Sequence, residues 1–379
     1  MLKGFKIRIY PTKEQEQKCW KHIGACRFVW NWMIDYQRNN YENGGKYLSA
    51  FEMSNLLKLL KNDGEHGWLY DISARSQQIV CADLNESYQR FFKKTSNFPK
   101  FKSRKHSKHG YPVAAERLIF EGRYVKVEKL GKMKYKTDFD IPQGRSVGKF
   151  CNARISFDGF KWFLSFAMKC ENQTPALTDK TMGIDLGVKE LAVVACGEEQ
   201  KTFHNINKSK RMKRLEKKIK HKQRSLSRKY EANKTENIYH KTNNIIREEL
   251  EIRRLRKRQL DIRHNYIHQV THELVSMLPR TVVMEDLNVS GMMKNKHLSK
   301  AIQEQCFYEF IRQMKYKCEW NGIEFVQVDR FYPSSKTCSN CGTIKKDLKL
   351  SDRTFVCPDC GFTIDRDYNA ALNLMRYAT

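Results

Sequence analysis

The sequence has few acidic residues for its size and no long apolar run. Its 379 residues include 42 Asp and Glu against 71 Lys and Arg, a formal net charge of +29. No apolar run approaches the roughly 20 residues that a bilayer span needs. The N-terminus, "MLKGFKIRIYP", has no signal-peptide core. These absences argue against a membrane-spanning or secreted protein and favour a cytoplasmic or nuclear one.

The excess of positive charge indicates a polyanionic partner. Nucleic acid is the commonest such partner, and a membrane surface is the alternative. Hydrophobic residues make up 40% of the chain and aromatic residues 12%, which is ordinary for a globular protein with real cores. A chain of this length has room for two to four domains.

The first part of the chain combines strand patterns with a long helical stretch. Residues 1–10 and 113–170 show the alternation of half-buried strands, with hairpin turns at Glu121-Gly122 and Asp158-Gly159. The simplest arrangement is a small β-barrel that a helical domain interrupts. We assign the barrel to residues 1–12 and 110–172.

The helical stretch between these strands is assigned to a domain at residues 13–109. Capping-box patterns begin helices after Thr12 and Ser49. The stretch ends in "FPKFKSRKHSKHGY", Phe98 to Tyr111, which mixes basic and aromatic residues without apolar periodicity. Both a solvated basic loop and a loop that contacts a phosphate backbone fit this composition.

After a polar linker at residues 171–180, strand and helix patterns alternate. A hairpin in "MGIDLGVKELAVVAC", a strand in "RTVVMEDLNV", a helix at about 299–320 and a strand in "IEFVQVD" follow one another. This is the order of an α/β domain. The predicted fold class is therefore a multidomain α/β protein with an added β-barrel.

A strongly basic segment lies inside this second part. Residues 208–263 contain 21 Lys and Arg against 7 Asp and Glu, a net charge of +14. Apolar residues recur at helical spacing from Met212 to Leu226 and from Ile252 to Tyr266. This pattern predicts a long helical hairpin, at residues 208–278, with a narrow apolar seam and basic outer faces. A nucleic-acid contact is favoured, and a solvated surface hairpin is the alternative.

Four of the twelve cysteines form a metal-ligand pattern, C-x2-C-x15-C-x2-C. A Zn(II) ion takes four soft ligands in a tetrahedron, and two CxxC turns supply two each. Gly342 and Gly361 follow the pairs, where the backbone must bend tightly around the metal. The spacing predicts a structural zinc site with no open ligand position, and two disulfides are the alternative. The ligands are Cys338, Cys341, Cys357 and Cys360.

Two acids stand in or beside apolar strands. Asp185 lies inside "GIDLG", where a buried carboxylate is costly unless it is paired or binds a cation. Gly183 and Gly187 bracket it, and we interpret them as leaving room for a ligand backbone. Glu285 ends the run "VVM" on the strand face that includes Val283.

A third acid comes from "DRDYNAALNLMRYA", a good helix. Asp367 lies three and four residues before Ala370 and Ala371, at the head of the apolar face, whereas Asp365 suits an N-cap. Three carboxylates from two strands and a helix start can converge on two Mg(II) ions. Such a pair of ions can hydrolyse a phosphodiester. The alternative is that each acid is separately a cap, a strand-end surface residue or a member of an ion pair.

The motifs "GIDLGVKELAV", "VVMEDLNV", "SSKTCSNCG" and "CPDCGFTIDRDYNAALN" together resemble the TnpB family. This is a family of transposon-encoded RNA-guided nucleases related to type V CRISPR effectors. The resemblance implies a ribonuclease-H-like RuvC nuclease domain at residues 180–335 and 362–379, with a zinc ribbon inserted at 336–361. It also implies that the barrel is a wedge-type domain and the helical insert a recognition domain. The family's catalytic acids fall on Asp185, Glu285 and Asp367.

The resemblance further implies an activity and partners. The expected protein is a Mg-dependent endodeoxyribonuclease that binds a guide RNA of the omega type, recognises a short target-adjacent motif and cuts double-stranded target DNA. It would act as a monomer in a ribonucleoprotein, in the prokaryotic cytosol or nucleoid. Two alternatives remain open: a compact CRISPR-associated nuclease of the same fold, and a non-cleaving nucleic-acid-binding protein with a structural zinc.

Overall fold

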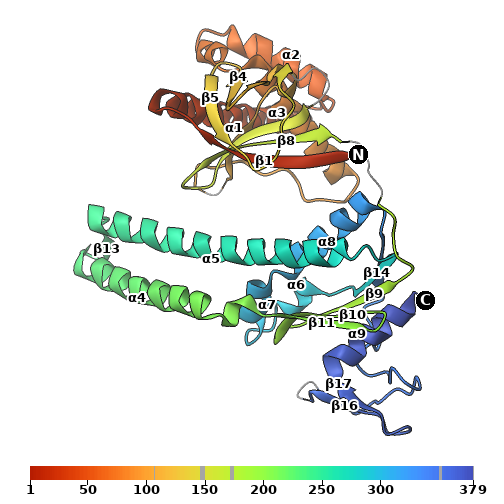
Figure 1. The fold of residues 1–379 in the computed structure, drawn as a ribbon. Coiled ribbons are helices and arrows are strands. Elements are labelled where there is room, and N and C mark those ends of the chain that lie inside the picture. Colours follow the sequence, from red (N-terminus) through yellow and green to blue (C-terminus); the bar gives the residue numbers. More distant parts are fainter. Residues whose placement is uncertain (106, 146–149, 171–174, 350–351, 379) are drawn as a thin grey trace. The chain divides into compact units, whose positions relative to one another are not determined.

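The structure, a computed structural model, describes residues 1–105, 107–145, 150–170, 175–349 and 352–378 (Figure 1). The chain divides into two compact units, Met1–Glu171 and Asn172–Thr379. Within the described ranges, no helix combines the length and the apolar character that crossing a bilayer requires.

The first unit contains an antiparallel sheet of eight strands, in the order β2-β7-β8-β1-β5-β4-β3-β6. The predicted hairpins are confirmed, because β3 pairs with β4 and β7 with β8. No pairing between described residues joins the edge strands β2 and β6, so closure into a barrel stays a prediction. The strands are β1 (Leu2–Tyr10), β2 (His109–Pro112), β3 (Ile119–Glu121), β4 (Tyr124–Val127), β5 (Gly131–Lys136), β6 (Gly144–Arg145), β7 (Phe150–Phe157) and β8 (Trp162–Lys169).

Among the described residues between β1 and β2, the chain forms three α-helices: α1 (Lys13–Glu42), α2 (Ala50–Lys61) and α3 (Ala74–Phe92). Both predicted capping boxes are confirmed, at Thr12 and Ser49. The helices and the sheet share one apolar core, in which Val29 and Leu84 from helices pack with Ile155 and Leu164 from strands. Short 3₁₀ helices lie at Gly67–Asp71, Ala115–Arg117 and, in the second unit, Ile206–Lys208.

The second unit contains a five-stranded sheet in the order β11-β10-β9-β14-β15. β9 (Thr181–Leu186), β10 (Glu190–Cys196) and β11 (Glu199–His204) form an antiparallel meander. β14 (Thr281–Glu285) runs parallel to both β9 and β15 (Glu324–Val328). The strands predicted for an α/β domain are confirmed.

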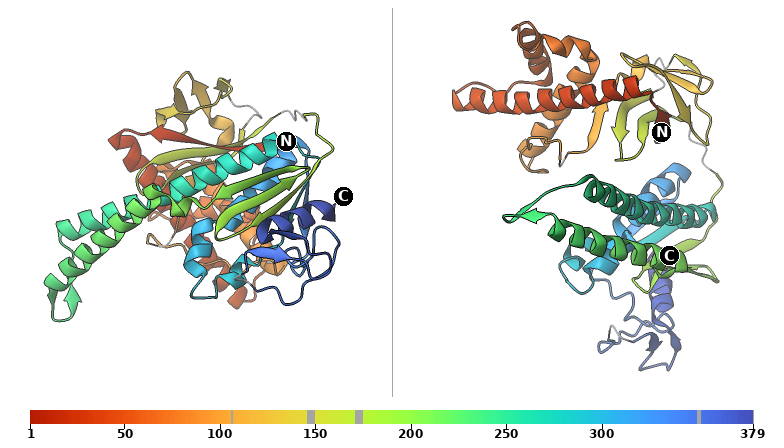
Figure 2. Two further views of the ribbon diagram at one scale, coloured as in Figure 1. Left: turned by 60° about the horizontal axis from the view of Figure 1, so that its bottom comes forward. Right: turned by 90° about the vertical axis from the view of Figure 1, so that its left-hand side faces the viewer.

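Helices cover both faces of this sheet, as the two views in Figure 2 show. Since side chains alternate along a strand, each strand serves two cores. One face packs on α5 (Asn243–Ser276) and α8 (Phe307–Asn321), and the other packs on α9 (Arg366–Tyr377). The first core includes Met182, Ile184, Met284, Leu274 and Phe310, and the second includes Val193, Ala195, Val283, Ala371 and Leu374.

The basic segment forms the predicted helical hairpin of α4 (Lys210–Ala232) and α5, two long helices side by side in Figures 1 and 2. β12 (Lys234–Thr235) and β13 (Ile238–Tyr239) pair at its tip. The apolar seam is narrow: Met212, Leu215, Ile219 and Leu255 form one buried cluster, with Ile262 packed against it.

The single helix predicted at about 299–320 is wrong. The chain instead forms α7 (Ser299–Gln305) and α8, which meet at Cys306 in the left-handed region with φ of 54°. The Gln305 side chain donates to the carbonyl oxygens of Gly187 and Val188, at 2.9 and 3.1 Å. The break lets Gln305 anchor the β9–β10 turn while Phe307 and Phe310 enter the core. A short helix, α6 (Val289–Met292), precedes α7.

Between β15 and α9 the chain forms an irregular segment with a small hairpin of β16 (Thr354–Val356) and β17 (Thr363–Asp365). This segment contains all four clustered cysteines. Residues 171–174 of the predicted polar linker lie outside the described residues. The boundaries of the predicted barrel, recognition, nuclease and ribbon domains stay predictions.

Candidate active site and metal centre

The four clustered cysteines converge. Their sulfur atoms all lie within 4.8 Å of one another. Gly342 and Gly361 have φ of 82° and 68°, which L-residues adopt only with strain, so the tight bends expected after each pair are present. A hydrogen bond with Thr343 lowers the pKa of Cys341 to about 6, which favours the thiolate that binds metals. Four soft ligands at this spacing fit a tetrahedral Zn(II) ion.

The predicted acids lie on one face of the second sheet. In the parallel pairing of β9 with β14, Ile184 lies opposite Met284, so Asp185 and Glu285 are the next residues on neighbouring strands. Both lie on the α9 side of the sheet, because Gly183 and Val283, two residues earlier on each strand, face that helix. Asp367 lies in the first turn of α9 itself.

The electrostatics of this cluster oppose the ionisation of Asp185, and Arg366 offsets part of that effect. Burial raises the pKa of Asp185 well above its usual range, and the charges of Glu285 and Asp367 raise it further. Burial also raises the pKa of Glu285. A bound cation would relieve both effects, since it replaces the lost hydration and offsets the mutual repulsion.

The carboxylates are less tightly grouped than the thiols. Among the described residues, the four cysteines are the only group of three or more ligands whose donor atoms all lie within 4.8 Å of one another. The acids therefore lie on one face of the sheet, close enough for Glu285 and Asp367 to raise the pKa of Asp185. Their oxygen atoms do not all converge on one point.

Asp365 and Asp367 have different partners. Asp365 Oδ1 accepts hydrogen bonds from the backbone N–H groups of Asp367 and Tyr368, both at 3.0 Å, so its prediction as the N-cap is confirmed. Asp367 Oδ1 pairs with Arg366 at 2.9 Å. Sequence spacing did not indicate this pair, because neighbouring residues on a helix do not normally face each other.

The interpretation of Gly183 as space for a ligand is wrong. A Cβ atom there would lie 2.1 Å from the carbonyl oxygen of Ala371 and 2.4 Å from the backbone nitrogen of Met375. The glycine lets α9 pack directly on β9. At Gly187 a Cβ would meet the Glu190 carbonyl oxygen at 3.2 Å, which is a tight local turn and also not a ligand site.

Buried polar residues around the acids were also missed. Ser334 donates to Glu285, and Asn369 and Asn373 bind the backbone that carries Ser334 and the first cysteine. Each contact joins segments far apart in the sequence, so no local pattern could have indicated it. The exposed Asp286 on the opposite face pairs with Arg330 at 2.9 Å instead.

In the first unit, part of the basic-aromatic stretch is fixed against α1. The Trp30 indole nitrogen donates to the carbonyl oxygen of Lys100, and the Asn31 amide binds both backbone groups of Lys102. The Lys102 ammonium lies 3.2 Å from the centre of the Trp30 ring, and burial lowers the pKa of Lys102 to about 8. This part of the stretch is therefore not a freely solvated loop.

Two adjoining cavities, of about 460 and 520 Å³, lie along α1 and share Gly24 and Arg27 in their linings. A Cβ at Gly24 would meet nothing within 4 Å, so packing does not require a glycine in this helix interior. Basic and aromatic side chains dominate the remaining lining: Trp20, Lys21, Phe28, Trp32, Phe101, Arg104 and His109. We call this surface the α1 groove.

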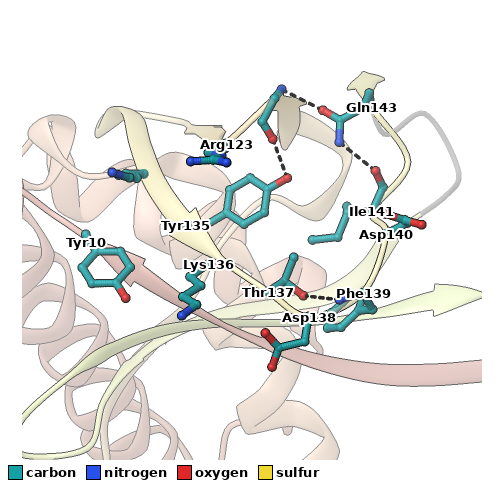
Figure 3. A pocket seen from close by; sticks show the side chains of 12 residues that line it. Tyr10, Arg123, Tyr135, Lys136, Thr137, Asp138, Phe139, Asp140, Ile141 and Gln143 are labelled. Carbon is teal, nitrogen blue, oxygen red and sulfur yellow. Dashed lines mark hydrogen bonds between the residues drawn. The ribbon is translucent and has the colours of Figure 1, made fainter.

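A larger cavity of about 1180 Å³ lies at β5 and the segment that follows it (Figure 3). The Tyr135 hydroxyl donates to the carbonyl oxygen of Gly122 at 2.9 Å, which fixes the ring in the wall. Lysine and arginine side chains line this cavity together with aromatic rings, and that combination suits a nucleic-acid strand. The charged and aromatic members of the lining are Tyr10, Arg123, Lys134, Tyr135, Lys136, Asp138, Phe139 and Asp140.

Three protein families match segments of the chain. The family described as "Probable transposase" matches residues 165–296, and "Cas12f1-like, TNB domain" matches residues 307–374. A "Helix-turn-helix domain" family matches residues 1–46, where the structure has β1 followed by the single helix α1.

The chain is also similar over its whole length to curated proteins. It is 32% identical over 391 residues to the Escherichia coli (strain K12) protein named "Putative RNA-guided DNA endonuclease InsQ", covering 99% of this chain and 92% of that one. The chain belongs to the TnpB family. A second member, a "Putative RNA-guided DNA endonuclease" of Streptomyces pristinaespiralis, is 30% identical over 98% of this chain and 88% of its own length.

Solved structures resemble this TnpB-family chain more distantly. The "Structure of the mini-RNA-guided endonuclease CRISPR-Cas_phi3" covers 100% of this chain and 92% of its own, with 12% identity and a TM-score of 0.45.

Proposed function

We propose that the protein is an RNA-guided DNA endonuclease that cleaves target DNA with metal ions held by Asp185, Glu285 and Asp367. One observation carries the proposal. In a chain with a net charge of +29, three acids from two strands and a helix share one face of a sheet, and burial with mutual repulsion raises the pKa of Asp185. The names of the two curated relatives support the same activity.

The acids would serve as ligands for Mg(II), a hard cation that prefers oxygen donors. Two such ions, when bound, would activate a water molecule and stabilise the leaving oxygen of a phosphodiester. The sheet register would fix Asp185 beside Glu285, and α9 would bring Asp367 to the same face. Arg366 would hold Asp367 in its present orientation through their ion pair.

The second metal would be a structural Zn(II) ion held by Cys338, Cys341, Cys357 and Cys360. With four protein ligands it has no position for a substrate, so its contribution is to fold the segment between β15 and α9. This segment would be the zinc ribbon that interrupts a ribonuclease-H-like RuvC domain. The sheet order, with an antiparallel meander and two further strands parallel to its first strand, supports that fold.

The nucleic acids would lie on the basic surfaces. We assign the guide RNA and its duplex with target DNA to the α4–α5 hairpin, the α1 groove and the cavity beside β5. The wedge and recognition domains of the first unit would recognise the target-adjacent motif. Such a ribonucleoprotein, with one copy of the chain, would act in the prokaryotic cytosol or nucleoid.

Purifying the protein and sequencing the RNA that is bound to it tests whether the protein carries a guide RNA. A discrete RNA with one constant end and one variable end would support RNA guidance. RNA-free protein, or a random mixture, would favour a non-cleaving nucleic-acid-binding protein. A compact CRISPR-associated nuclease is the remaining alternative, and the gene's genomic neighbourhood distinguishes it from a transposon-encoded one.

The Asp185→Ala variant tests the nuclease site. We expect it to lose Mg-dependent cleavage and to keep its RNA, because the acid lies on the α9 side of the sheet, opposite the face that packs on α5 of the basic hairpin. Unchanged cleavage by this variant would contradict the assignment of Asp185 as a catalytic residue.

Salt-dependent binding tests the α1 groove. Replacing Arg27 with Gln should weaken binding and reduce the slope of log K against log salt by roughly 0.7–0.9, the value for one lost phosphate contact. Lys58→Gln, an exposed change of the same charge on α2, is the matched control. Equal slopes for the two variants would show that the α1 groove does not contact nucleic acid.

A further inference from the structure

A hydroxyl group holds one of the candidate metal-binding acids. Ser334 Oγ donates to Glu285 Oε1 at 2.5 Å, and Ser334 is only 3% exposed. Ser334 follows β15 and precedes the first cysteine by four residues. A carboxylate held at one oxygen cannot rotate freely, so the direction of its second oxygen depends on where Ser334 is placed.

Asn373 fixes the position of Ser334. Its side-chain nitrogen donates to the carbonyl oxygen of Ser334 at 2.7 Å and to that of Thr337 at 2.6 Å. The amide is buried, with Asn373 4% exposed, and both of its N–H donors are used. A buried amide with satisfied donors holds a turn in one conformation, because any movement leaves polar groups unpaired.

Asn369, one helical turn earlier on α9, binds the same segment next to the cysteines. Its Nδ2 donates to the Thr337 carbonyl oxygen at 2.7 Å, and its Oδ1 accepts from the Ser339 backbone nitrogen at 3.0 Å. Thr337 and Ser339 flank Cys338, and Asn369 is fully buried. The backbone on both sides of the first thiol is therefore tied to the helix that carries Asp367.

We propose that Ser334 and Asn373 are positioning residues that orient the Glu285 carboxylate, and that Asn369 ties the same segment to the four-cysteine cluster. The structure thereby joins the two candidate metal centres through α9 and the 334–339 segment. The inference deepens the proposed nuclease function and rests on it. It predicts that Glu285 loses its orientation when any of these hydrogen bonds is removed.

The first test removes a single hydroxyl group. In the full chain with its copurified RNA, Ser334→Ala should lower kcat for DNA cleavage by about 10- to 100-fold, the usual effect of losing a group that orients a metal ligand. KM for DNA should stay constant, because the basic surfaces are intact. The Mg(II) concentration for half-maximal cleavage should rise, and Ser334→Thr, which keeps the hydroxyl, should restore much of the rate.

A binding measurement separates orientation from general damage. Mn(II) binding, followed by electron paramagnetic resonance without any turnover, should weaken by a similar factor in Ser334→Ala. Bound zinc should stay at one ion per chain. Ser276→Ala is the matched control, since its hydroxyl donates to the His272 carbonyl oxygen on the far helix α5. That control should bind Mn(II) and cleave as the wild type does.

A double-mutant cycle tests the connection to Asn373. If Asn373 acts only through Ser334, the Ser334→Ala/Asn373→Ala double variant should cleave no more slowly than Asn373→Ala alone. Should Asn373→Ala fail to fold, the Ser334 variants alone decide the question. Wild-type Mn(II) affinity and cleavage in Ser334→Ala would overturn the inference and leave the nuclease function standing. A wild-type protein that cleaves no DNA at all would instead overturn the function.

Discussion

The two candidate metal centres differ in how the chain supplies their ligands. The four thiols come from one segment of 23 residues, residues 338–360, whose turns bring them together locally. The three acids come from β9, β14 and α9, spread over 183 residues, and meet only because a sheet and a helix pack. The thiol site is compact, with four ligand atoms within 4.8 Å of one another, whereas the acid site is wider and its members raise the pKa of Asp185. Local turns can bring the four thiols together, whereas the three acids reach one face only in the finished fold.

The largest effect should come from removing charge at the acid site. Asp185→Asn should lower cleavage by at least about a thousandfold, since a catalytic metal is worth several kcal/mol of transition-state stabilisation. The same change should raise the melting temperature measured without added Mg(II), because it removes a carboxyl group whose ionisation its surroundings and its acidic neighbours oppose. Zinc content should not change. A destabilised variant, or one that still cuts, would mean that Asp185 is an ordinary structural acid.

A methyl group at Gly183 should move α9 and so impair the acid site while leaving the cysteine site intact. The added Cβ would meet backbone atoms at 2.1 and 2.4 Å, so Gly183→Ala should cost about 1–3 kcal/mol of unfolding free energy. Cleavage should fall by about a hundredfold as Asp367 shifts, while the local cysteine site keeps its zinc. Gly4→Ala, in a strand with open space around the new Cβ, is the control. Equal melting temperatures for both variants would contradict the close packing of β9 and α9.

The reverse experiment disrupts the thiol site. Cys357→Ser should lose zinc and the order of the segment around β16 and β17, because small zinc ribbons depend on the metal for folding. Cleavage should fall about 10- to 100-fold through the connection to Glu285, and the melting transition of the five-stranded sheet should persist. Zinc analysis and cleavage rates check this, with Cys170→Ser as the control. Full activity without zinc would show that the two centres are independent.

The smallest effect should come from Lys317 on α8, the helix that packs on the other face of the sheet, away from both candidate metal centres. Burial lowers the pKa of Lys317 to about 8, and its ammonium donates to Thr271 Oγ1 and the His268 carbonyl oxygen. An unfolded lysine keeps its proton to about pH 10.4. Between these values the unfolded state binds more protons, so the unfolding free energy should rise with pH. Lys317→Met should flatten that rise in melts from pH 7 to 10.5 without changing zinc content. An unchanged slope would contradict the lowered pKa.

Local patterns in the sequence predicted much of the fold and only part of the site. Capping boxes, hairpin turns, the strand alternation and the cysteine spacing each depend on neighbours within a few residues, and the structure confirms them. The helix argument also separated Asp365, the cap, from Asp367. The misreading of Gly183 and the missed Ser334, Asn369 and Asn373 have a common cause. Their partners lie on other elements, and a single sequence does not say which segments will meet.

The packing of α9 on β9 determines when the three acids can assemble during synthesis of the chain. Asp367 follows Asp185 by 182 residues. At about 5–20 residues per second, synthesis of the intervening chain takes about 10–40 s. Until then the face of β9 and β10 that carries Gly183, Val193 and Ala195 has no helix to cover it. The basic hairpin of α4 and α5 is therefore made before the last acid, and the three acids cannot assemble before the last helix is made. A chain that stops after α5 and before α9 keeps the basic hairpin and lacks one of the three acids.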